Sequence, residues 1–232
     1  MRALDGTYLD QFATLFETYD VPAAFWVNIK LTFFAAVLSL VLGTVLAVMR
    51  ISPLPSLRWA GTTYVNVFRN TPLTIIVVFC VLGLWGQLGV TLAPDFNENF
   101  LRLAILGLAV YHAAFVCEAL RSGVNTVPVG QAEAARAIGL GFLPTARLII
   151  LPQAFRGAVA PLGNTLIALT KNSTVAAAGS VAEASGLMST MIEFRPDVIV
   201  AIFLTFALGF VVLVIPVGLL TTSLSRRLAV AR

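Results

Sequence analysis

The 232-residue sequence has little charge, since 11% of its residues are Asp, Glu, Lys or Arg. The two lysines, Lys30 and Lys171, do not follow a glycine, as the lysine of a phosphate-binding P-loop does. The single histidine, His112, excludes the paired histidines of an HExxH zinc site, and no Gly-x-Ser-x-Gly elbow occurs. Cys80 and Cys117 have no CxxC spacing. We therefore expect neither a P-loop ATPase nor a zinc or serine hydrolase in this chain.

Hydrophobic residues make up 59% of the sequence, and the mean hydropathy is +0.93. A bilayer core about 30 Å thick is crossed by about 20 helical residues, and five runs reach or approach that length with few charges. They are continuous and do not alternate with polar residues, which disfavours a β-barrel. The sequence predicts an all-α integral membrane protein with five transmembrane helices, at about 23–49, 73–90, 101–120, 158–179 and 198–220.

The distribution of basic residues predicts the orientation, because cytoplasmic loops retain Lys and Arg. If the N-terminus lies outside, the inner side collects Arg50, Arg58, Arg69, Arg121, Arg136, Arg147, Arg156, Arg226, Arg227 and Arg232. The outer side then holds three arginines, Arg2, Arg102 and Arg195. We expect an extracytoplasmic segment at 1–22, a transmembrane domain at 23–224 and a cytoplasmic tail at 225–232. The basic balance indicates topology and anionic lipid, and no basic and aromatic patch for nucleic acid is present.

The loop at 122–155 is the least hydrophobic stretch between two spans, and the topology places it in the cytoplasm. Within "VPVGQAEAARAIGLGFLPTARLIILPQ", the run 132–137 favours a helix that Gly139 and Gly141 stop, and Pro144 favours a second short helix. The small Ala-rich face suits a groove on another protein better than deep insertion into lipid. The alternative is a simple cytoplasmic connector.

Lys171 is the second informative residue, because it lies about 20 Å into the fourth span. A charge at that depth costs about 2.5–3.5 kcal/mol on insertion scales, so an acidic partner or a water-filled cavity is expected. Lys171 either snorkels or pairs with an acid, or it contacts a carboxylate of the substrate. Nearby candidates for hydrogen bonds to a substrate are Asn164, Thr165, Thr170, Asn172 and Ser173.

Glu118 and Arg121 are three residues apart near the inner end of the third span, which predicts a local ion pair or, alternatively, a gate or substrate contact. Arg69 and Asn70 stand at the start of the second span. They line an inner vestibule or bind a lipid phosphate.

The segments "FRNTPL", "AFVCEALRSGVNTVPVGQAEAARAIG" and "LPQAFRGAVAPLGNTLIALTKNST" resemble, in this order along the chain, the membrane subunits of polar amino acid ABC importers. The segments "AFWVNIKLT", "RNTPLT" and "GNTLIALTKN" are most similar in sequence to glutamate permease subunits of actinobacterial importers. The resemblance covers about residues 25–224 and implies the type I permease fold, with five spans and the N-terminus outside.

The resemblance also implies that the loop is a coupling helix, which docks into a separate ATP-hydrolysing subunit. The residues that match its core are Glu133, Ala134, Ala135 and Gly139, and Leu151 and Pro152 end it. This chain would hold no cofactor, because ATP and Mg would be bound by the partner. The implied partners are two ATP-binding subunits, an extracytoplasmic amino-acid-binding protein and a second permease subunit, either a paralogue or an identical copy.

Many relatives carry an acid directly after the matching lysine, whereas this chain has Asn172. The missing negative charge leaves Lys171 uncompensated and favours an acidic substrate, glutamate or aspartate. Two other classes remain open at this stage: a self-contained secondary carrier or channel acting through Lys171 and Glu118, and a non-transporting scaffold. No inverted repeat supports the carrier.

Overall fold

The computed structural model describes residues 14–228, and within that range the chain forms helices and no β-strand. The predicted all-α class is therefore confirmed. The α-helices are, in chain order, α2 (Val21–Ile51), α3 (Pro55–Asn70), α4 (Leu73–Val78), α5 (Leu84–Gly86), α6 (Phe96–Val124), α7 (Val129–Ala137), α8 (Phe142–Thr145), α9 (Leu151–Gly157), α10 (Val159–Asn172), α11 (Ala184–Phe194) and α12 (Ile199–Leu228). Turns of π-helix join α4 to α5 and α8 to α9, and turns of 3-10 helix follow α10 (Ser173–Gly179) and precede α12 (Pro196–Val198).

Acidic side chains set where two long helices begin. Asp20 accepts a hydrogen bond from the Ala23 amide at 2.9 Å and caps α2, and Asp95 accepts one from the Glu98 amide at 2.8 Å and caps α6. Such caps satisfy backbone donors that a helix leaves free at its start. For this reason α6 begins five residues before the apolar run that predicted it.

Among the described residues, three helices are long and apolar enough to cross a membrane: α2, α6 and Pro196–Arg227. Two further candidates are bent pairs. α3 meets Leu73–Gly86 at 105°, and Val159–Gly179 meets α11 at 55°. Pro72 explains the first bend, because it holds the preceding Thr71 in an extended conformation that ends α3. The helix expected at 73–90 ends at Gly86, and the chain turns at Gly89 with a φ of +67°.

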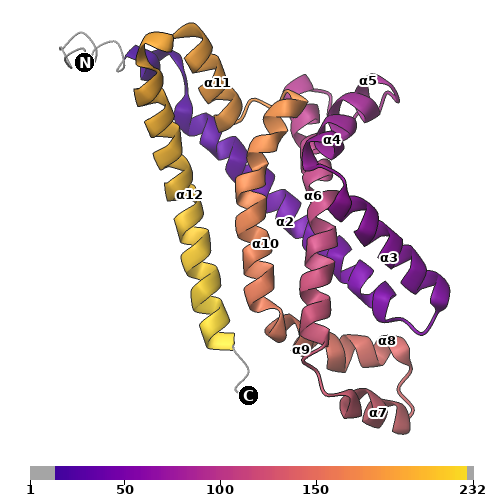
Figure 1. Cartoon of the computed structure of the whole chain (residues 1–232). Helices are drawn as coiled ribbons and strands as arrows, with labels where there is room; N and C mark the ends of the chain where they lie inside the picture. Colours follow the sequence, from indigo (N-terminus) through magenta and orange to yellow (C-terminus); the bar gives the residue numbers. More distant parts are fainter. Residues whose placement is uncertain (1–13, 229–232) are drawn as a thin grey trace.

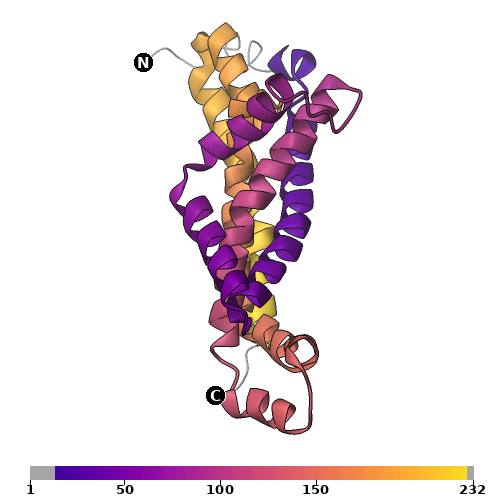
Figure 2. The ribbon, with the colours of Figure 1, turned by 90° about the vertical axis from the view of Figure 1, so that its right-hand side faces the viewer.

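Helix α6 forms the centre of the fold, and α12 lies at its edge (Figures 1 and 2). In its most apolar stretch α6 has 72% of residues buried, against 17% for α12. Small residues permit close helix crossings where the hydrophobic effect gives no drive for helices to associate. A Cβ added at Gly43 of α2 would lie 2.5 Å from Val116 Cγ1 of α6, and one added at Gly163 of α10 would lie 2.7 Å from Thr221 Cβ of α12.

The long helices run between two opposite ends of the molecule (Figures 1 and 2). One end carries α5, α11 and the start of α2. The other end carries α7, α8, α9 and the last turn of α12. The loop at 122–155 and the C-terminal end of α12 therefore share one end of the helix bundle, and the start of α2 lies at the other.

Candidate functional site

The segment that joins α6 to α9 folds as the predicted helix, turn and helix. α7 ends in a backbone turn in which the Gly139 amide donates to Arg136 O and the Leu140 amide donates to Ala135 O, both at 3.0 Å. Gly139 has a φ of +85°, a left-handed conformation that a side chain disfavours. The glycine is therefore required by the turn, while α8 begins three residues later at Phe142.

The exposed surface of this segment is more apolar than its small residues suggested. Glu133 and Ala134 are exposed, but Ala135 is buried against the segment itself. Four large apolar side chains are at least 65% exposed: Val129, Ile138, Leu143 and Leu148. Sequence reasoning missed these four residues, although four large apolar side chains on a segment outside the spans are themselves a signal for a protein contact.

Helix α9 fixes this segment to the end of α6. A Cβ added at Gly123 of α6 would meet the Ala154 carbonyl oxygen and lie 2.9 Å from the Ala154 carbonyl carbon. A Cβ added at Gly157 of α9 would lie 2.6 Å from Thr126 Oγ1. The side chains of Gln131 in α7 and Gln153 in α9 are also joined by a hydrogen bond. The two residues expected to end the loop, Leu151 and Pro152, form the first turn of α9. Helix α9, which follows the segment and is bonded to it, is thus in direct contact with α6 through backbone.

Helix α10 presents Asn164 and Lys171 on one exposed face, since residues seven apart lie on the same side of a helix. Neither side chain has a hydrogen bond or ion pair with another residue in the described range. Lys171 lies about 18 Å along α10 from its start. It lines a groove between α10 and α12 whose other walls are Thr174, Phe210, Val211, Val214 and Ile215. Lys171 is therefore an exposed cation between α10 and the membrane-length helix α12.

The hydroxyl groups expected near Lys171 are bonded to their own helix. Thr165 donates to Pro161 O at 3.0 Å, and Thr170, which is buried, donates to Leu166 O at 2.9 Å. Ser173 is fully buried and donates to Thr170 O at 2.8 Å. These three residues lie apart from the face of Asn164 and Lys171.

Asn172 faces α6 and contacts the buried His112. His112 Nδ1 lies 2.9 Å from Leu108 O, and its Nε2 lies 3.2 Å from Asn172 Nδ2. Because a carbonyl oxygen only accepts, Nδ1 carries the proton and Nε2 accepts from the Asn172 amide. His112 therefore orients one of the substrate-binding candidates. Sixty residues separate the two, so no local pattern predicted the contact.

A buried polar network joins α2 to the break before α11. The Asn28 amide donates to Ser173 Oγ at 2.9 Å and to Glu183 Oε2 at 2.8 Å, and it accepts from the Ala184 amide. Glu183 also accepts from the Ser185 and Gly186 amides and so caps α11. Every member is buried and bonded, which indicates a structural role for Ser173 in holding the bent pair to α2.

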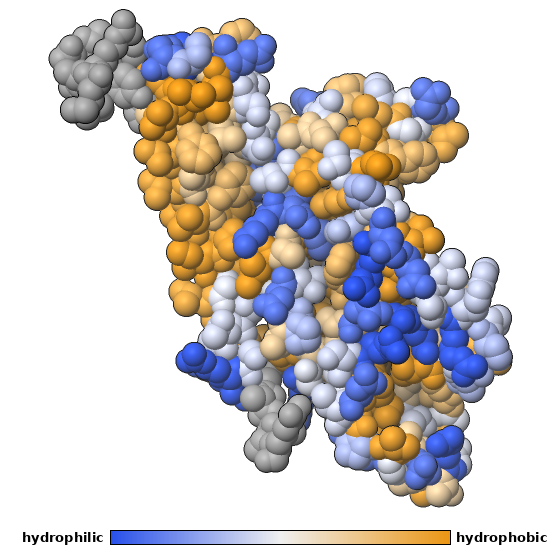
Figure 3. Space-filling model, in the orientation of Figure 1, coloured by the Kyte–Doolittle hydropathy of each residue, from blue (hydrophilic) through white to orange (hydrophobic). Residues whose placement is uncertain are grey.

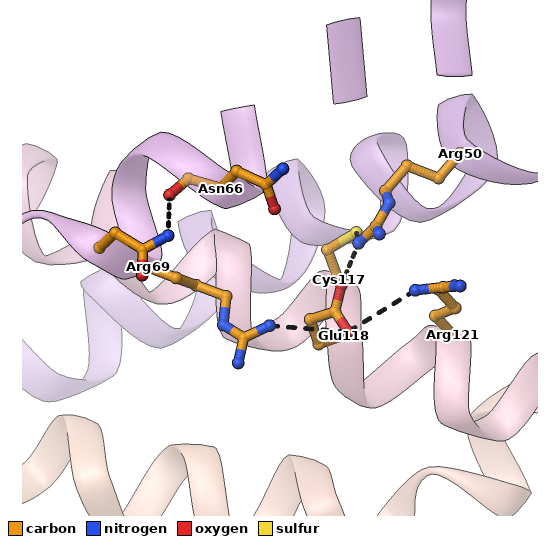
Figure 4. Close-up of polar contacts among 7 residues, drawn as sticks. Arg50, Asn66, Arg69, Cys117, Glu118 and Arg121 are labelled. Carbon is orange, nitrogen blue, oxygen red and sulfur yellow. Dashed lines mark hydrogen bonds and ion pairs between the residues drawn. The ribbon is translucent and has the colours of Figure 1, made fainter. Parts of the chain in front are cut away.

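Glu118 lies at the centre of a second polar group, which we call the arginine cluster: Glu118 with Arg50, Arg69 and Arg121 (Figure 4). One carboxylate oxygen, Oε1, is bonded to Arg50 of α2. The other, Oε2, lies 3.8 Å from Arg69 Nη1 and 3.9 Å from Arg121 Nη1. The predicted pair of Glu118 with Arg121 is present, but Arg50, which the sequence did not link to it, makes the closest contact.

Arg69 and Asn70 behave differently although they are adjacent. The Arg69 guanidinium lies 5.7 Å from the centre of the Phe115 ring and faces Glu118. Asn70 Nδ2 donates to Asn66 O at 2.7 Å within α3 and makes no contact with Glu118. Hydrophilic residues gather over α3 and α10 on one face of the molecule, next to the apolar surface of α12 (Figure 3). We call the exposed polar side chains Asn66, Arg69, Asn164 and Lys171 the polar face.

Comparison with known proteins adds independent information. The family model described as "Binding-protein-dependent transport system inner membrane component" matches residues 17–230. The chain is 52% identical over 214 residues to the glutamate transport system permease protein GluC of Corynebacterium glutamicum, covering 90% of this chain and 94% of that protein. It is 33% identical over 205 residues to the glutamate/aspartate import permease protein GltK of Escherichia coli O157:H7, covering 88% and 91%.

Two solved structures have a similar fold. A chain from the crystal structure of an amino acid ABC transporter with histidines has a TM-score of 0.76 at 24% identity, and the match covers 97% of this chain and 100% of that one. A chain of the MetNI methionine ABC transporter in an inward-facing conformation has a TM-score of 0.70 at 22% identity, with coverages of 90% and 96%. The type I permease fold implied by the sequence is supported by these neighbours.

Proposed function

The chain belongs to the family of inner membrane components of binding-protein-dependent transport systems, and from this premise we propose that it carries glutamate or aspartate across the cytoplasmic membrane as the permease subunit of an ABC importer. The observation that supports an acidic substrate is the position of Lys171. It is an exposed cation with no acidic partner in the described range, and it lines the groove between α10 and α12. The two relatives described above are permeases for glutamate or for glutamate and aspartate, which agrees with this assignment.

We propose that the chain crosses the membrane five times, with the bent pairs as the second and fourth spans, the N-terminus outside and the C-terminus in the cytoplasm. Basic residues support this orientation, because Arg50, Arg121, Arg226 and Arg227 occupy the last turns of α2, α6 and α12. These turns share one end of the molecule with α7 and α8 (Figure 1). The segment 1–22 is outside in this arrangement and 225–232 is the cytoplasmic tail; residues 1–13 and 229–232 lie beyond the described range.

Within the membrane, the polar face must be shielded from lipid. Exposed polar side chains at membrane depth are costly in lipid, so they face a water-filled path or another protein. We propose that a second permease subunit, a paralogue or an identical copy, covers this face and that the solute moves between the two. The cavity lined by α2, α9, α10 and α12 is almost wholly apolar and is unsuited to a charged amino acid.

We propose that the α7–α8 segment docks into an ATP-binding subunit, which binds ATP and Mg, and that an extracytoplasmic binding protein delivers the amino acid. Val129, Ile138, Leu143 and Leu148 form the apolar contact, with Glu133 and Ala134 exposed beside them. The contact between α9 and α6 at Gly123 and Gly157 gives movement of the ATPase a direct route to the central helix.

The test is reconstitution of the complete complex in proteoliposomes with ATP inside. Binding protein loaded with glutamate or aspartate is expected to stimulate ATP hydrolysis and uptake, and binding protein offered arginine is not. Lys171→Gln is expected to lower glutamate uptake about tenfold, the effect of losing one charge-assisted contact. Uptake without the ATP-binding subunits, or equal stimulation by arginine, would contradict the proposal.

A further inference from the structure

The arginine cluster carries more positive charge than its single acid can balance. Three guanidinium groups, from α2, α3 and α6, face the Glu118 carboxylate, and no other acid pairs with Arg50, Arg69 or Arg121 within residues 14–228. The group therefore has a net charge of about +2, because arginine stays protonated in proteins. An excess of this size close to the membrane attracts anions.

The two oxygens of Glu118 are engaged to different degrees. Oε1 is bonded to Arg50, whose side chain is only 10% exposed, and this contact ties α2 to α6. Oε2 lies beyond hydrogen-bond distance of both Arg69 and Arg121, at 3.8 and 3.9 Å. Arg50 is thus a structural partner, whereas the other two arginines are held loosely.

The N–H groups of Arg69 and Arg121 are available as hydrogen-bond donors. Their side chains are 46% and 49% exposed, and neither donates a hydrogen bond to any described residue. Both approach the same oxygen from opposite sides (Figure 4), so an anion bound beside Glu118 Oε2 would be within reach of both. A guanidinium presents paired N–H groups that match a carboxylate or a phosphate.

The position of the cluster favours a carboxylate of the transported solute. Arg69 belongs to the polar face, and Arg121 lies in the last turn of α6, at the end of the molecule that holds α7 and α8. The guanidinium carbon of Arg69 lies 5.7 Å from the centre of the Phe115 ring, a cation–π contact that helps to hold the side chain in place. On the proposed function, this end faces the cytoplasm and the polar face is the solute path.

We propose that Arg69 and Arg121 form an anion-binding site at the inner end of the path, where the substrate carboxylate takes the place of Glu118 Oε2 before release. Glu118 competes with the substrate carboxylate for Arg69 and Arg121. It pairs with the two arginines when the site is empty and pairs with them again when the solute leaves. The inference rests on the proposed function and adds a second contact point beyond Lys171.

The variant Arg69→Gln/Arg121→Gln tests this site in the complete complex, in right-side-out proteoliposomes with ATP inside. Glutamate uptake is expected to fall about tenfold or more, since a charge-assisted contact is lost. Arg69→Lys/Arg121→Lys is expected to restore most of it. Arg58→Gln is the matched control, because Arg58 is exposed on the same helix without an ion pair and lies about 16 Å away along α3. Unchanged uptake in the double Gln variant would overturn the inference.

A second measurement separates a binding role from a structural one. Vesicles preloaded with unlabelled glutamate are expected to import labelled glutamate more slowly through the wild-type complex, because the inner site is occupied, but not through the double Gln variant. Equal wild-type uptake by empty and preloaded vesicles would overturn the inference.

The lipid composition distinguishes a solute carboxylate from a lipid phosphate. The loss in the double Gln variant is expected in vesicles of phosphatidylcholine alone and in vesicles that also contain phosphatidylglycerol. A loss confined to the anionic vesicles would assign the site to a lipid headgroup and overturn the inference. A wild-type complex that imports neither glutamate nor aspartate would instead refute the proposed function, and the substrate assigned to this site would fall with it.

Discussion

Gly123→Ala tests whether α6 and the α7–α8 segment move together. The added Cβ would meet the Ala154 carbonyl oxygen, lie 2.9 Å from the Ala154 carbonyl carbon and lie 3.0 Å from Ala158 Cβ. Two of these atoms belong to backbone, so no side-chain rotation relieves the contact. Helices α6 and α9 must therefore separate to regain ordinary packing.

Overpacking of this kind costs about 1–3 kcal/mol, and a coupling energy of that size corresponds to about 5- to 150-fold in population. Because α9 follows α7 and α8 and is joined to α8 by one turn of π-helix, the displacement is expected to fall on the docking surface. We expect ATP hydrolysis stimulated by loaded binding protein to fall at least about fivefold, while the complex still assembles in the membrane.

Gly130→Ala is the matched control, because a Cβ at Gly130 of α7 has no atom within 4 Å and replaces glycine inside a helix. It is expected to be neutral or to stabilise α7 by about 0.5–1 kcal/mol. Stimulated hydrolysis by Gly123→Ala equal to that of Gly130→Ala would refute the idea that this crossing transmits the motion.

Three further changes have distinct expected results. Arg50→Met leaves the Glu118 carboxylate without its closest partner and is expected to lower stability by about 1–3 kcal/mol, seen as a lower melting temperature than that of Arg58→Met. Asn172→Asp replaces the donor to His112 Nε2 with an acceptor and adds a negative charge beside Lys171, so competition uptake should show about a tenfold weaker preference for glutamate over glutamine. Gly139→Arg forces a side chain into a left-handed backbone at a cost of about 1–2 kcal/mol and should uncouple an inserted protein, whereas Gly139→Asn, which tolerates that conformation, should retain most stimulated hydrolysis.

Local patterns in the sequence predicted the approximate positions of the long apolar helices. The run at 23–49 became Val21–Ile51, and 158–179 became Val159–Gly179. The alanine run and the glycines after it predicted α7 and its turn, because helix propensity and left-handed backbone are properties of a few adjacent residues. The size of the bend between α3 and α4 was not predicted: Pro72 ends α3, but the 105° angle also depends on how each helix packs on α6.

The polar contacts of the candidate site depend on residues far apart in the chain, and the sequence did not reveal them. Arg50 and Glu118 are 68 residues apart, and Asn28 and Glu183 are 155 apart. Their pairing follows from the crossing of α2 over α6 and of α2 against the break before α11. Ser173, expected as a substrate contact, is held in that second network because it lies on the side of α10 that faces α2.

Two sets of polar residues in this protein differ in how their burial cost is met: one is buried and hydrogen-bonded within the chain, and the other is exposed and unpaired. In lipid, apolar surface gives little drive for helices to associate, so packing of small residues and closed hydrogen-bond networks hold the helices together. Asn28, Ser173 and Glu183 form such a network, in which every member is buried and bonded. The same environment makes an exposed, unpaired cation costly, and Lys171 is retained in spite of that cost. Because the charge of Lys171 forms no ion pair within the described part of its own chain, it must be compensated by the transported solute or by the second permease subunit. This is the reason to seek the solute at Lys171 rather than at the buried hydroxyls beside it.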